Sequence, residues 1–234
     1  MMREFPFYLV STPIGNLSDL SLRAKEILAS VDFILAEDTR KSGTLLKHYG
    51  IETRMIPYHD HNKERVTPGI LDRIEGGETG ALVTDAGTPG ISDPGYYLVR
   101  AMTEREIEFT ALPGASSVMQ GLVLSGLPTD RFTFYGYVPR KKGARDRIFE
   151  EAGAAVGTAV FFESPHRIVA TLEALAAVLP GREAVVAREL TKLHEEVARG
   201  SAEELAVRFS KRKVRGEITL LIRGAGKRGR GGTA

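Results

Sequence analysis

The chain has 234 residues, of which 42% are hydrophobic and 26% are charged, a balance typical of a globular protein with a buried core and not of a disordered chain. It contains no cysteine, which excludes disulfide scaffolds, thiolate zinc sites and cysteine nucleophiles and suits a reducing compartment. The formal net charge is only +2, and the sequence shows neither the apolar core of a secretory signal nor the ~20 apolar residues of a membrane span. We therefore expect a cytoplasmic protein with no membrane partner.

The first half of the chain alternates short apolar runs with longer segments of helical spacing. This alternation predicts an α/β fold built on a mainly parallel sheet. Ser18 or Asp19 is expected to cap the first helix, with Leu22 on its buried side. Strands are predicted at residues 7–10, 31–36, 53–58, 80–84 and 107–112, and further helices at residues 44–49 and 63–75.

The second half repeats the same pattern after the turn at residues 113–117. We predict an N-terminal α/β domain at 1–113, a C-terminal α/β domain at 114–223 and a flexible basic tail at 224–234. Strands are predicted at residues 132–137, 158–163, 184–189 and 217–223, and helices at residues 118–127, 144–154, 168–179 and 202–211.

The most informative segment is LVTDAGTPGISDPG at residues 82–95, where a strand ends in a long turn-rich loop. Loops at the carboxyl ends of parallel strands line the ligand crevices of α/β sheets. Gly87 permits close approach of the backbone to a ligand, and Asp85 and Asp93 can accept hydrogen bonds from an amine or from ribose hydroxyls. The alternative is an irregular turn held by its own aspartate side chains.

Four other loops follow predicted strands in the same way. The loops at residues 12–16 and 113–117 could converge with residues 82–95 on one cleft. Residues 161–167 and 187–192 place ionisable groups at strand ends in the second half, although Arg188 and Glu189 could equally form a structural ion pair. His59 and His61 lack a third ligand at a readable spacing, so we expect no metal.

Basic residues are concentrated in two places. Residues 208–234 carry nine Lys and Arg against Glu217 alone, giving +8, and residues 140–147 carry a net +4. Such clusters favour a polyanionic partner, because neutralising phosphates releases counterions. The alternative for each is a solvated charged loop or a disordered tail.

Together these segments resemble one family. The resemblance rests on LVSTPIGNLSDLSLRA, ILAEDTRKSGTLLKHYGI, LVTDAGTPGISDPGYYLVR, ALPGASS, GLPTDRFTFYGYVPRKKG, FFESPHRI and ARELTKLHEE, and it runs from about residue 7 to residue 223. The chain is similar to the small-subunit ribosomal RNA methyltransferases that methylate the ribose 2′-oxygen of a decoding-centre cytidine in 16S rRNA, within the tetrapyrrole methylase superfamily.

The resemblance implies two α/β domains of the tetrapyrrole methylase type with S-adenosylmethionine in the cleft between them, unlike a Rossmann methyltransferase. It also implies a homodimer that acts on 16S rRNA within the small ribosomal subunit. The loop with Pro13, Gly15 and Asn16 would face the RNA, and we expect Arg40 and Lys192 to hold phosphates. The implied cofactor-binding residues are Asp85, Gly87, Thr88, Pro89, Ser116, Ser117, Glu163 and Ala187.

No catalytic residue is identified by the sequence. Methyl transfer to a hydroxyl needs a proton acceptor, and the candidates, which the sequence does not rank, are Glu37, Asp38, His59, Glu163 and Lys192. Two other functions remain open: a small-molecule methyltransferase acting on a tetrapyrrole-like acceptor, and a non-catalytic RNA-binding module. The basic tail argues against the first of these, because a tetrapyrrole acceptor does not require it.

Overall fold

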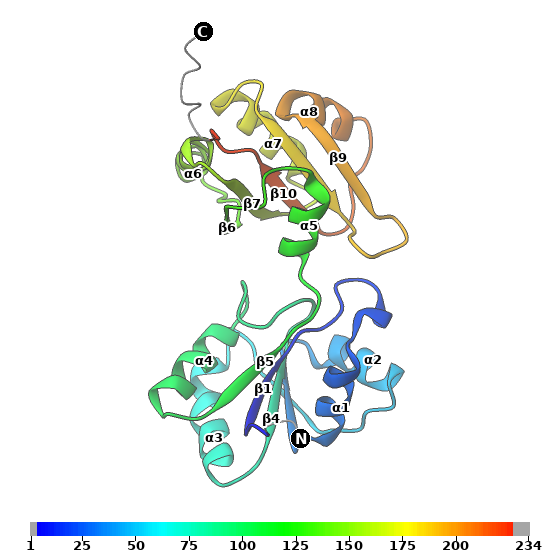
Figure 1. Cartoon of the computed structure of the whole chain (residues 1–234), viewed down its shortest axis with the longest axis vertical. Coiled ribbons are helices and arrows are strands. Elements are labelled where there is room, and N and C mark those ends of the chain that lie inside the picture. Colours follow the sequence, from blue (N-terminus) through cyan, green and yellow to red (C-terminus); the bar gives the residue numbers. More distant parts are fainter. Residues whose placement is uncertain (1–3, 227–234) are drawn as a thin grey trace. The chain divides into compact units, whose positions relative to one another are not determined.

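A computed structural model describes residues 4–226 of the chain, which divides into two compact units (Figure 1). Unit 1 ends at Ser116 and unit 2 begins at Ser117, whereas the sequence suggested a division after residue 113. Each unit has its own sheet and its own hydrophobic core. Helix α5 (Ser117–Ser125) therefore belongs wholly to unit 2.

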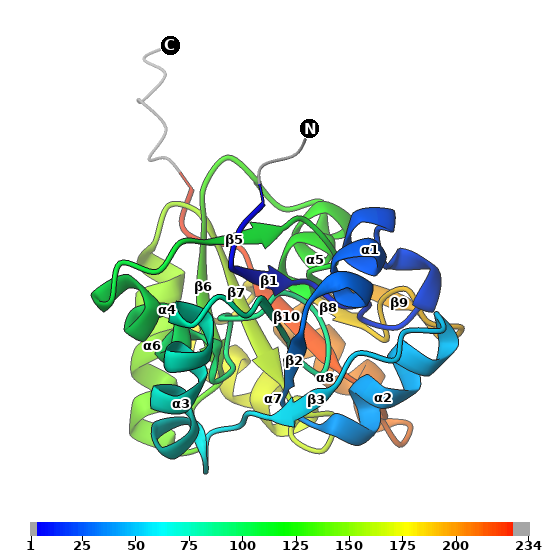
Figure 2. The same ribbon diagram turned by 90° about the horizontal axis from the view of Figure 1, so that it is seen from below.

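Unit 1 is a five-stranded sheet in which every neighbouring pair is parallel, in the order β3-β2-β4-β1-β5. Its interior strands are buried along their whole length, as expected for a sheet covered on both faces. Helices α1 and α2 cover one face and α3 and α4 cover the other (Figures 1 and 2). The elements are β1 (Phe7–Val10), η1 (Leu17–Asp19), α1 (Leu22–Ser30), β2 (Phe33–Ala36), α2 (Thr39–His48), β3 (Met55–Pro57), α3 (Lys63–Glu75), β4 (Gly80–Val83), α4 (Gly95–Glu104) and β5 (Phe109–Leu112).

Two helix starts in unit 1 differ from the prediction. Ser21, not Ser18 or Asp19, caps α1, because its Oγ accepts a hydrogen bond from the Ala24 N–H at 3.1 Å. Leu22 is consequently 81% exposed instead of buried. Helix α2 begins at Thr39, five residues before the predicted start at residue 44, because Asp38 caps it. Helix α4 was not predicted, since its first turn follows directly on the turn-rich loop after β4.

Unit 2 has a five-stranded sheet of mixed direction, in the order β6-β7-β10-β8-β9. The prediction of a mainly parallel sheet is wrong here: β6 and β7 are parallel, but the other three pairs are antiparallel. The reason is a hairpin between β8 and β9, whose second strand was not predicted because EVARGS has only Ala198 buried. The elements are β6 (Phe132–Tyr137), α6 (Lys142–Ala154), β7 (Thr158–Glu163), α7 (Ile168–Val178), β8 (Glu183–Arg188), β9 (Glu196–Ser201), α8 (Ala202–Ser210) and β10 (Ile218–Ile222).

The two faces of the unit 2 sheet are covered differently. Helices α6, α7 and α8 pack on one face through Phe149, Leu172 and Phe209 (Figure 1). On the other face α5 lies against β10, where a Cβ on Gly121 would be 3.1 Å from Cγ2 of Thr219. The small residue lets this helix lie close to the sheet.

The first residues of the predicted flexible tail, 224–226, belong to the described structure, and two of them contact unit 2. The N–H of Ala225 donates to the Ala155 carbonyl at 2.7 Å, and Gly224 fits closely against the backbone of Ala155 and Gly157. Residues 227–234 of that tail lie outside the described residues. Among residues 4–226, no helix combines the length and apolar character needed to cross a bilayer.

Candidate active site

Three loops meet at the carboxyl edge of the sheet in unit 1. Thr12, just after β1, and Gly87, in the loop after β4, form an antiparallel bridge with N–H to carbonyl distances of 2.9 and 3.0 Å. Ser11 Oγ donates to Thr88 Oγ1 at 3.2 Å, and Thr88 Oγ1 donates to the carbonyl of Ala115, after β5, at 3.3 Å. The predicted convergence of the loops after β1, β4 and β5 is confirmed.

Two glycines allow these loops to approach so closely. A Cβ on Gly114 would lie 2.6 Å from Cβ of Ser11, a distance that no side chain could occupy. Gly87 has φ +88°, and its Cβ would lie between loops, 3.6 Å from Cγ2 of Ile14 and 3.8 Å from the Ala115 carbonyl. At Gly114 the loops after β1 and β5 therefore meet without a side chain between them, and at Gly87 a Cβ would take up the position between the loops after β1 and β5.

The two aspartates of the β4–α4 loop have different roles. Asp93 accepts hydrogen bonds from the N–H of Gly90 at 2.8 Å and of Gly95 at 2.7 Å. It holds the turn, which is the structural alternative considered for this loop. Asp85 instead reaches across to α2: its Oδ1 accepts from the N–H of Asp38 at 3.2 Å and its Oδ2 lies 2.5 Å from Lys41 Nζ. The Asp85 side chain is 27% exposed, so its carboxylate can still accept a donor from a ligand.

A row of ionisable groups continues from Asp85 along the ends of β4 and β2. Glu37 Oε2 accepts a hydrogen bond from Thr84 Oγ1 at 3.0 Å. Arg40 donates to both oxygens of Asp38, through Nε at 3.0 Å and Nη2 at 2.7 Å, and this holds the pKa of Asp38 well below its usual range. The Arg40 side chain is nevertheless 90% exposed, which leaves it accessible to an external anion.

The remaining predicted residues of unit 1 lie in the loops after β1 and β3. Gly15 and Asn16 are exposed and Pro13 is half-buried, and Asn16 Oδ1 caps η1 by accepting from the Ser18 N–H at 3.1 Å. The Nδ1 atom of His59 is buried and has no hydrogen-bond partner in the part of the chain that the structure describes.

Glu163 and Ala187 are both buried in unit 2. The Glu163 carboxylate accepts hydrogen bonds from the Ser164 N–H at 2.6 Å and from Thr171 Oγ1 at 2.5 Å, and it lies 3.4 Å from Arg167 Nη2. Its oxygens are thus bonded inside the unit. Ala187 is paired on both sides in the sheet, with β9 and with β10.

Lys192 is also held by unit 2. Its Nζ lies 2.9 Å from Glu189 Oε1 and 3.1 Å from Glu217 Oε2. Burial alone would lower the pKa of Lys192, but the hydrogen bonds to these two carboxylates outweigh it and the pKa is raised. Arg188 pairs with Glu196 at 3.3 Å, so the ion pair considered between Arg188 and Glu189 does not form.

Of the predicted cofactor residues, Asp85, Gly87, Thr88, Pro89 and Ser116 belong to unit 1, and Ser117, Glu163 and Ala187 belong to unit 2. Sequence reasoning missed Lys41 and Ser11. The sequence could have indicated Lys41 as a site residue, because it lies in the first turn of a helix that Asp38 caps, beside the loop after β4. It could also have indicated Ser11, since this residue directly follows a buried strand.

Comparison with known proteins identifies the family. A family model described as Tetrapyrrole (Corrin/Porphyrin) Methylases matches residues 6–206. The protein named "Ribosomal RNA small subunit methyltransferase I" from Synechocystis sp. is 46% identical over 219 residues, covering 93% of this chain and 78% of that one. The protein of the same name from Halalkalibacterium halodurans is 43% identical over 221 residues, covering 94% and 76% of the two chains.

Solved structures show the same fold at low sequence identity. A diphthine synthase has a TM-score of 0.69 and 16% identity, with 93% of this chain and 89% of that one covered. The uroporphyrin-III-C-methyltransferase of Thermus thermophilus has a TM-score of 0.65 and 19% identity, with 93% of each chain covered. The predicted fold class is thereby confirmed, and this chain belongs to the tetrapyrrole methylase family and, within it, to the group named ribosomal RNA small subunit methyltransferase I.

Proposed function

We propose that this protein transfers a methyl group from S-adenosylmethionine to the ribose 2′-OH of a decoding-centre cytidine in 16S rRNA. The observation that carries the proposal is the identity of 43–46% along more than nine-tenths of the chain to proteins named as small-subunit rRNA methyltransferases. The fold alone selects no acceptor, because proteins with differently named substrates share it.

The loops of unit 1 have the chemistry to hold this cofactor. S-adenosylmethionine carries an amine and two ribose hydroxyls, which need acceptors, and a carboxylate, which needs donors. Asp85 offers a partly exposed carboxylate, and the space beside Gly87 would be filled by any side chain. We assign cofactor binding to Asp85, Gly87, Thr88, Pro89 and Ser116 of unit 1 and to Ser117, Glu163 and Ala187 of unit 2.

Glu163 and Ala187 would contribute in a particular way. The Glu163 carboxylate is bonded within unit 2 and Ala187 has no polar side-chain atom. Both would therefore contact the cofactor through main-chain or Cβ atoms.

The reaction then depends mainly on positioning. The bound cofactor supplies a methyl group that is already activated by its sulfonium. The protein has to hold the ribose oxygen in line with that group, and such alignment can lower a barrier by ~7–11 kcal/mol. We assign RNA positioning to Pro13, Gly15 and Asn16, and phosphate binding to Arg40 and Lys192, of which Arg40 is the more accessible.

We propose Glu37 or His59 as the proton acceptor, because the other three candidates are less suited to this role. Glu163 is bonded inside unit 2, Asp38 is paired with Arg40, and Lys192 keeps its proton because its pKa is raised. Glu37 and His59 remain, both at the carboxyl edge of the unit 1 sheet. A base within hydrogen-bond reach typically contributes 10²–10⁴-fold in rate.

The test uses methyl-labelled S-adenosylmethionine and small ribosomal subunits from cells that lack this protein. We expect label on the ribose 2′-oxygen of a single decoding-centre cytidine, and none with Asp85→Ala. Label on a base, on another nucleotide or on no RNA at all would contradict the proposal. Retained cofactor binding without label would favour a different acceptor or a non-catalytic module.

The resemblance also suggests a homodimer that acts in the cytoplasm, where small subunits are assembled. Sedimentation equilibrium should give twice the mass of the 25.5 kDa chain. A mass of one chain at micromolar concentration would contradict the dimer.

A further inference from the structure

Three aromatic side chains form a cluster on one face of the unit 2 sheet. The ring centroid of Phe162 lies 4.8 Å from that of Phe134 and 5.5 Å from that of Tyr137. The neighbouring Tyr135 points to the opposite face, where it stacks on the core residue Phe161 at 4.9 Å. We refer to Phe134, Tyr137 and Phe162 as the aromatic cluster.

A β-bulge in β6 creates this cluster. Phe134 pairs with Val160 and Tyr137 pairs with Phe162, so three steps along β6 match two steps along β7. Residues three apart on a regular strand point to opposite faces, but the extra residue brings both onto one face. Gly136, with φ +72°, provides the irregularity.

The cluster is open to solvent at its β6 edge. Tyr137 is 63% exposed, and Phe132, which points to the same face two residues before Phe134, is 39% exposed. Aromatic side chains exposed next to one another on an edge strand indicate a surface that contacts a partner.

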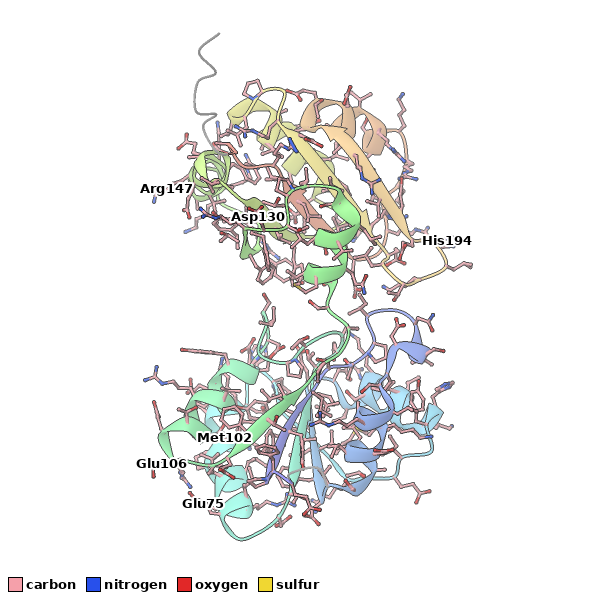
Figure 3. All side chains as sticks on the ribbon, viewed as in Figure 1. Glu75, Met102, Glu106, Asp130, Arg147 and His194 are labelled. Carbon is pink, nitrogen blue, oxygen red and sulfur yellow. The ribbon has the colours of Figure 1, made fainter. Side chains whose placement is uncertain are left out.

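A group of basic residues follows the aromatic cluster's strand β6 directly in the sequence. Arg140, Lys141, Lys142 and Arg147 are exposed, and none has an ion pair among residues 4–226; Arg147 projects outward from α6 (Figure 3). Elsewhere in this unit, three arginines surround the single carboxylate of Glu196. Four cations without an ion pair in the described part of the chain thus lie within residues 140–147, which we name the cationic turn; Lys211, Lys213 and Arg215 form a second such group, away from the aromatic cluster in the sequence.

The link between the two features is rigid. Arg167 Nη2 donates to the carbonyls of Val138 at 3.0 Å and Pro139 at 3.3 Å, and it also lies 3.4 Å from the buried carboxylate of Glu163. These contacts hold the two residues that join Tyr137 to Arg140.

We propose that the aromatic cluster and the cationic turn together bind a single-stranded segment of RNA. Bases would stack on Tyr137 while backbone phosphates pair with the cations of the turn, a combination typical of surfaces that bind single strands. The inference rests on the proposed function, since it assigns to unit 2 a contact with the substrate RNA. An uncharged apolar partner would leave the cations of the turn without counterparts.

The test measures RNA binding by the full-length protein in the absence of cofactor. The probe is a short fluorescent single-stranded oligoribonucleotide, titrated by anisotropy at several KCl concentrations. R140A/K142A should weaken binding about tenfold and reduce the slope of log K against log salt by about 1.4, for two phosphate contacts on a single strand. Y137L should weaken binding about 5- to 100-fold without changing the slope, and Y137F should bind as the wild type does.

The matched control is K47A/R54A, which removes the same charge from exposed positions in unit 1. It should leave both affinity and slope unchanged. An equal loss of RNA affinity in the control, or no loss of RNA affinity in Y137L, would overturn the inference. A third outcome would also overturn the inference. If the variants sediment as monomers while the wild type is a dimer, and if they bind RNA as the wild type does, the surface joins two copies of the chain.

This experiment is separable from the test of the proposed function. Binding is measured without cofactor, so the surface can be confirmed even if small subunits take up no label. Conversely, normal labelling together with unaltered RNA binding by the variants would overturn this inference alone. Cofactor affinity, measured by calorimetry, should be the same in R140A/K142A, Y137L and the wild type.

Discussion

Lys41 Nζ lies 2.5 Å from Asp85 Oδ2, so the first turn of α2 is tied to the loop after β4. The two side chains are 64% and 27% exposed. An ion pair of this exposure contributes only ~0–1 kcal/mol to stability. The pair therefore fixes the orientation of a carboxylate at the site more than it stabilises the unit.

Asp85→Asn should separate these two effects. We expect it to change the free energy of unfolding in urea by less than about 1 kcal/mol and to raise the Kd for S-adenosylmethionine at least tenfold, because a carboxylate acceptor is lost. Asp32→Asn is the matched control: Asp32 accepts from Thr79 at 2.7 and 2.8 Å, just before β2 at the opposite end of the sheet. Equal effects of both variants on the Kd would contradict the assignment of Asp85.

Gly87→Ala tests the close approach of the loops. Forcing a side chain to φ +88° should cost about 1–2 kcal/mol of stability and should abolish cofactor binding, because the Cβ enters the space between the loops. Gly50 has φ +67° and no atom within 4 Å of its Cβ position. Gly50→Ala should therefore lose similar stability by differential scanning fluorimetry and keep full cofactor affinity; a loss of affinity there would argue against a local effect at Gly87.

Glu163→Ala tests the buried network of unit 2. The change removes the acceptor of Thr171 Oγ1 and of the Ser164 N–H, whereas Arg167 keeps its bonds to the Val138 and Pro139 carbonyls, so we expect a loss of about 1–3 kcal/mol in the free energy of unfolding. Glu173, exposed on α7, the helix that carries Thr171, serves as the control, and its replacement by alanine should cost less than about 0.5 kcal/mol. Comparable stabilities of the two variants in urea titrations would show that the network contributes little.

Glu196→Gln should change the dependence of stability on pH. The Glu196 carboxylate lies 2.5 Å from Arg212 and 2.8 Å from Arg208; burial raises its pKa, but these bonds outweigh burial and the pKa falls below its ordinary value. Because the folded pKa is the lower one, the stabilisation is present above the unfolded value of about 4.3 and is lost as the pH falls through the folded value.

We therefore expect the wild type to be more stable than Glu196→Gln by about 1–2 kcal/mol at neutral pH. The difference should shrink as the pH falls below about 4. Urea titrations across this range would measure it, and a difference that stays constant down to pH 3 would contradict the prediction.

Much of unit 1 could be predicted because its signals are local. β1 and α3 match the predicted ranges, since an apolar run or an amphipathic period marks each of them. The convergence of three loops followed from parallel strands, whose carboxyl ends share one edge. The contacts of each side chain could not be predicted from the parallel strands alone. Lys41 and Asp85, for example, are 44 residues apart, and only the order of the strands brings them together.

Unit 2 was harder to predict because its arrangement depends on distant pairing. Strand β9 lacks an apolar run, and β10 enters between β7 and β8, which makes the sheet mixed. The aromatic cluster could not be predicted from the sequence for a similar reason. Tyr137 and Phe162 lie on different strands, and the bulge at Gly136 removes the alternation that would have marked one face.

The position of β1 and β10 within their sheets has a consequence for synthesis on the ribosome. β1 pairs with β4 and β5, so it is not paired on both sides until Leu112 has been made, a delay of roughly 5–20 s at ordinary elongation rates. β10 is the central strand of its sheet, and it is made after all four of the others. A ribosome that stalls before Ile218 would thus carry a folded first unit and a second unit that chaperones still have to shield.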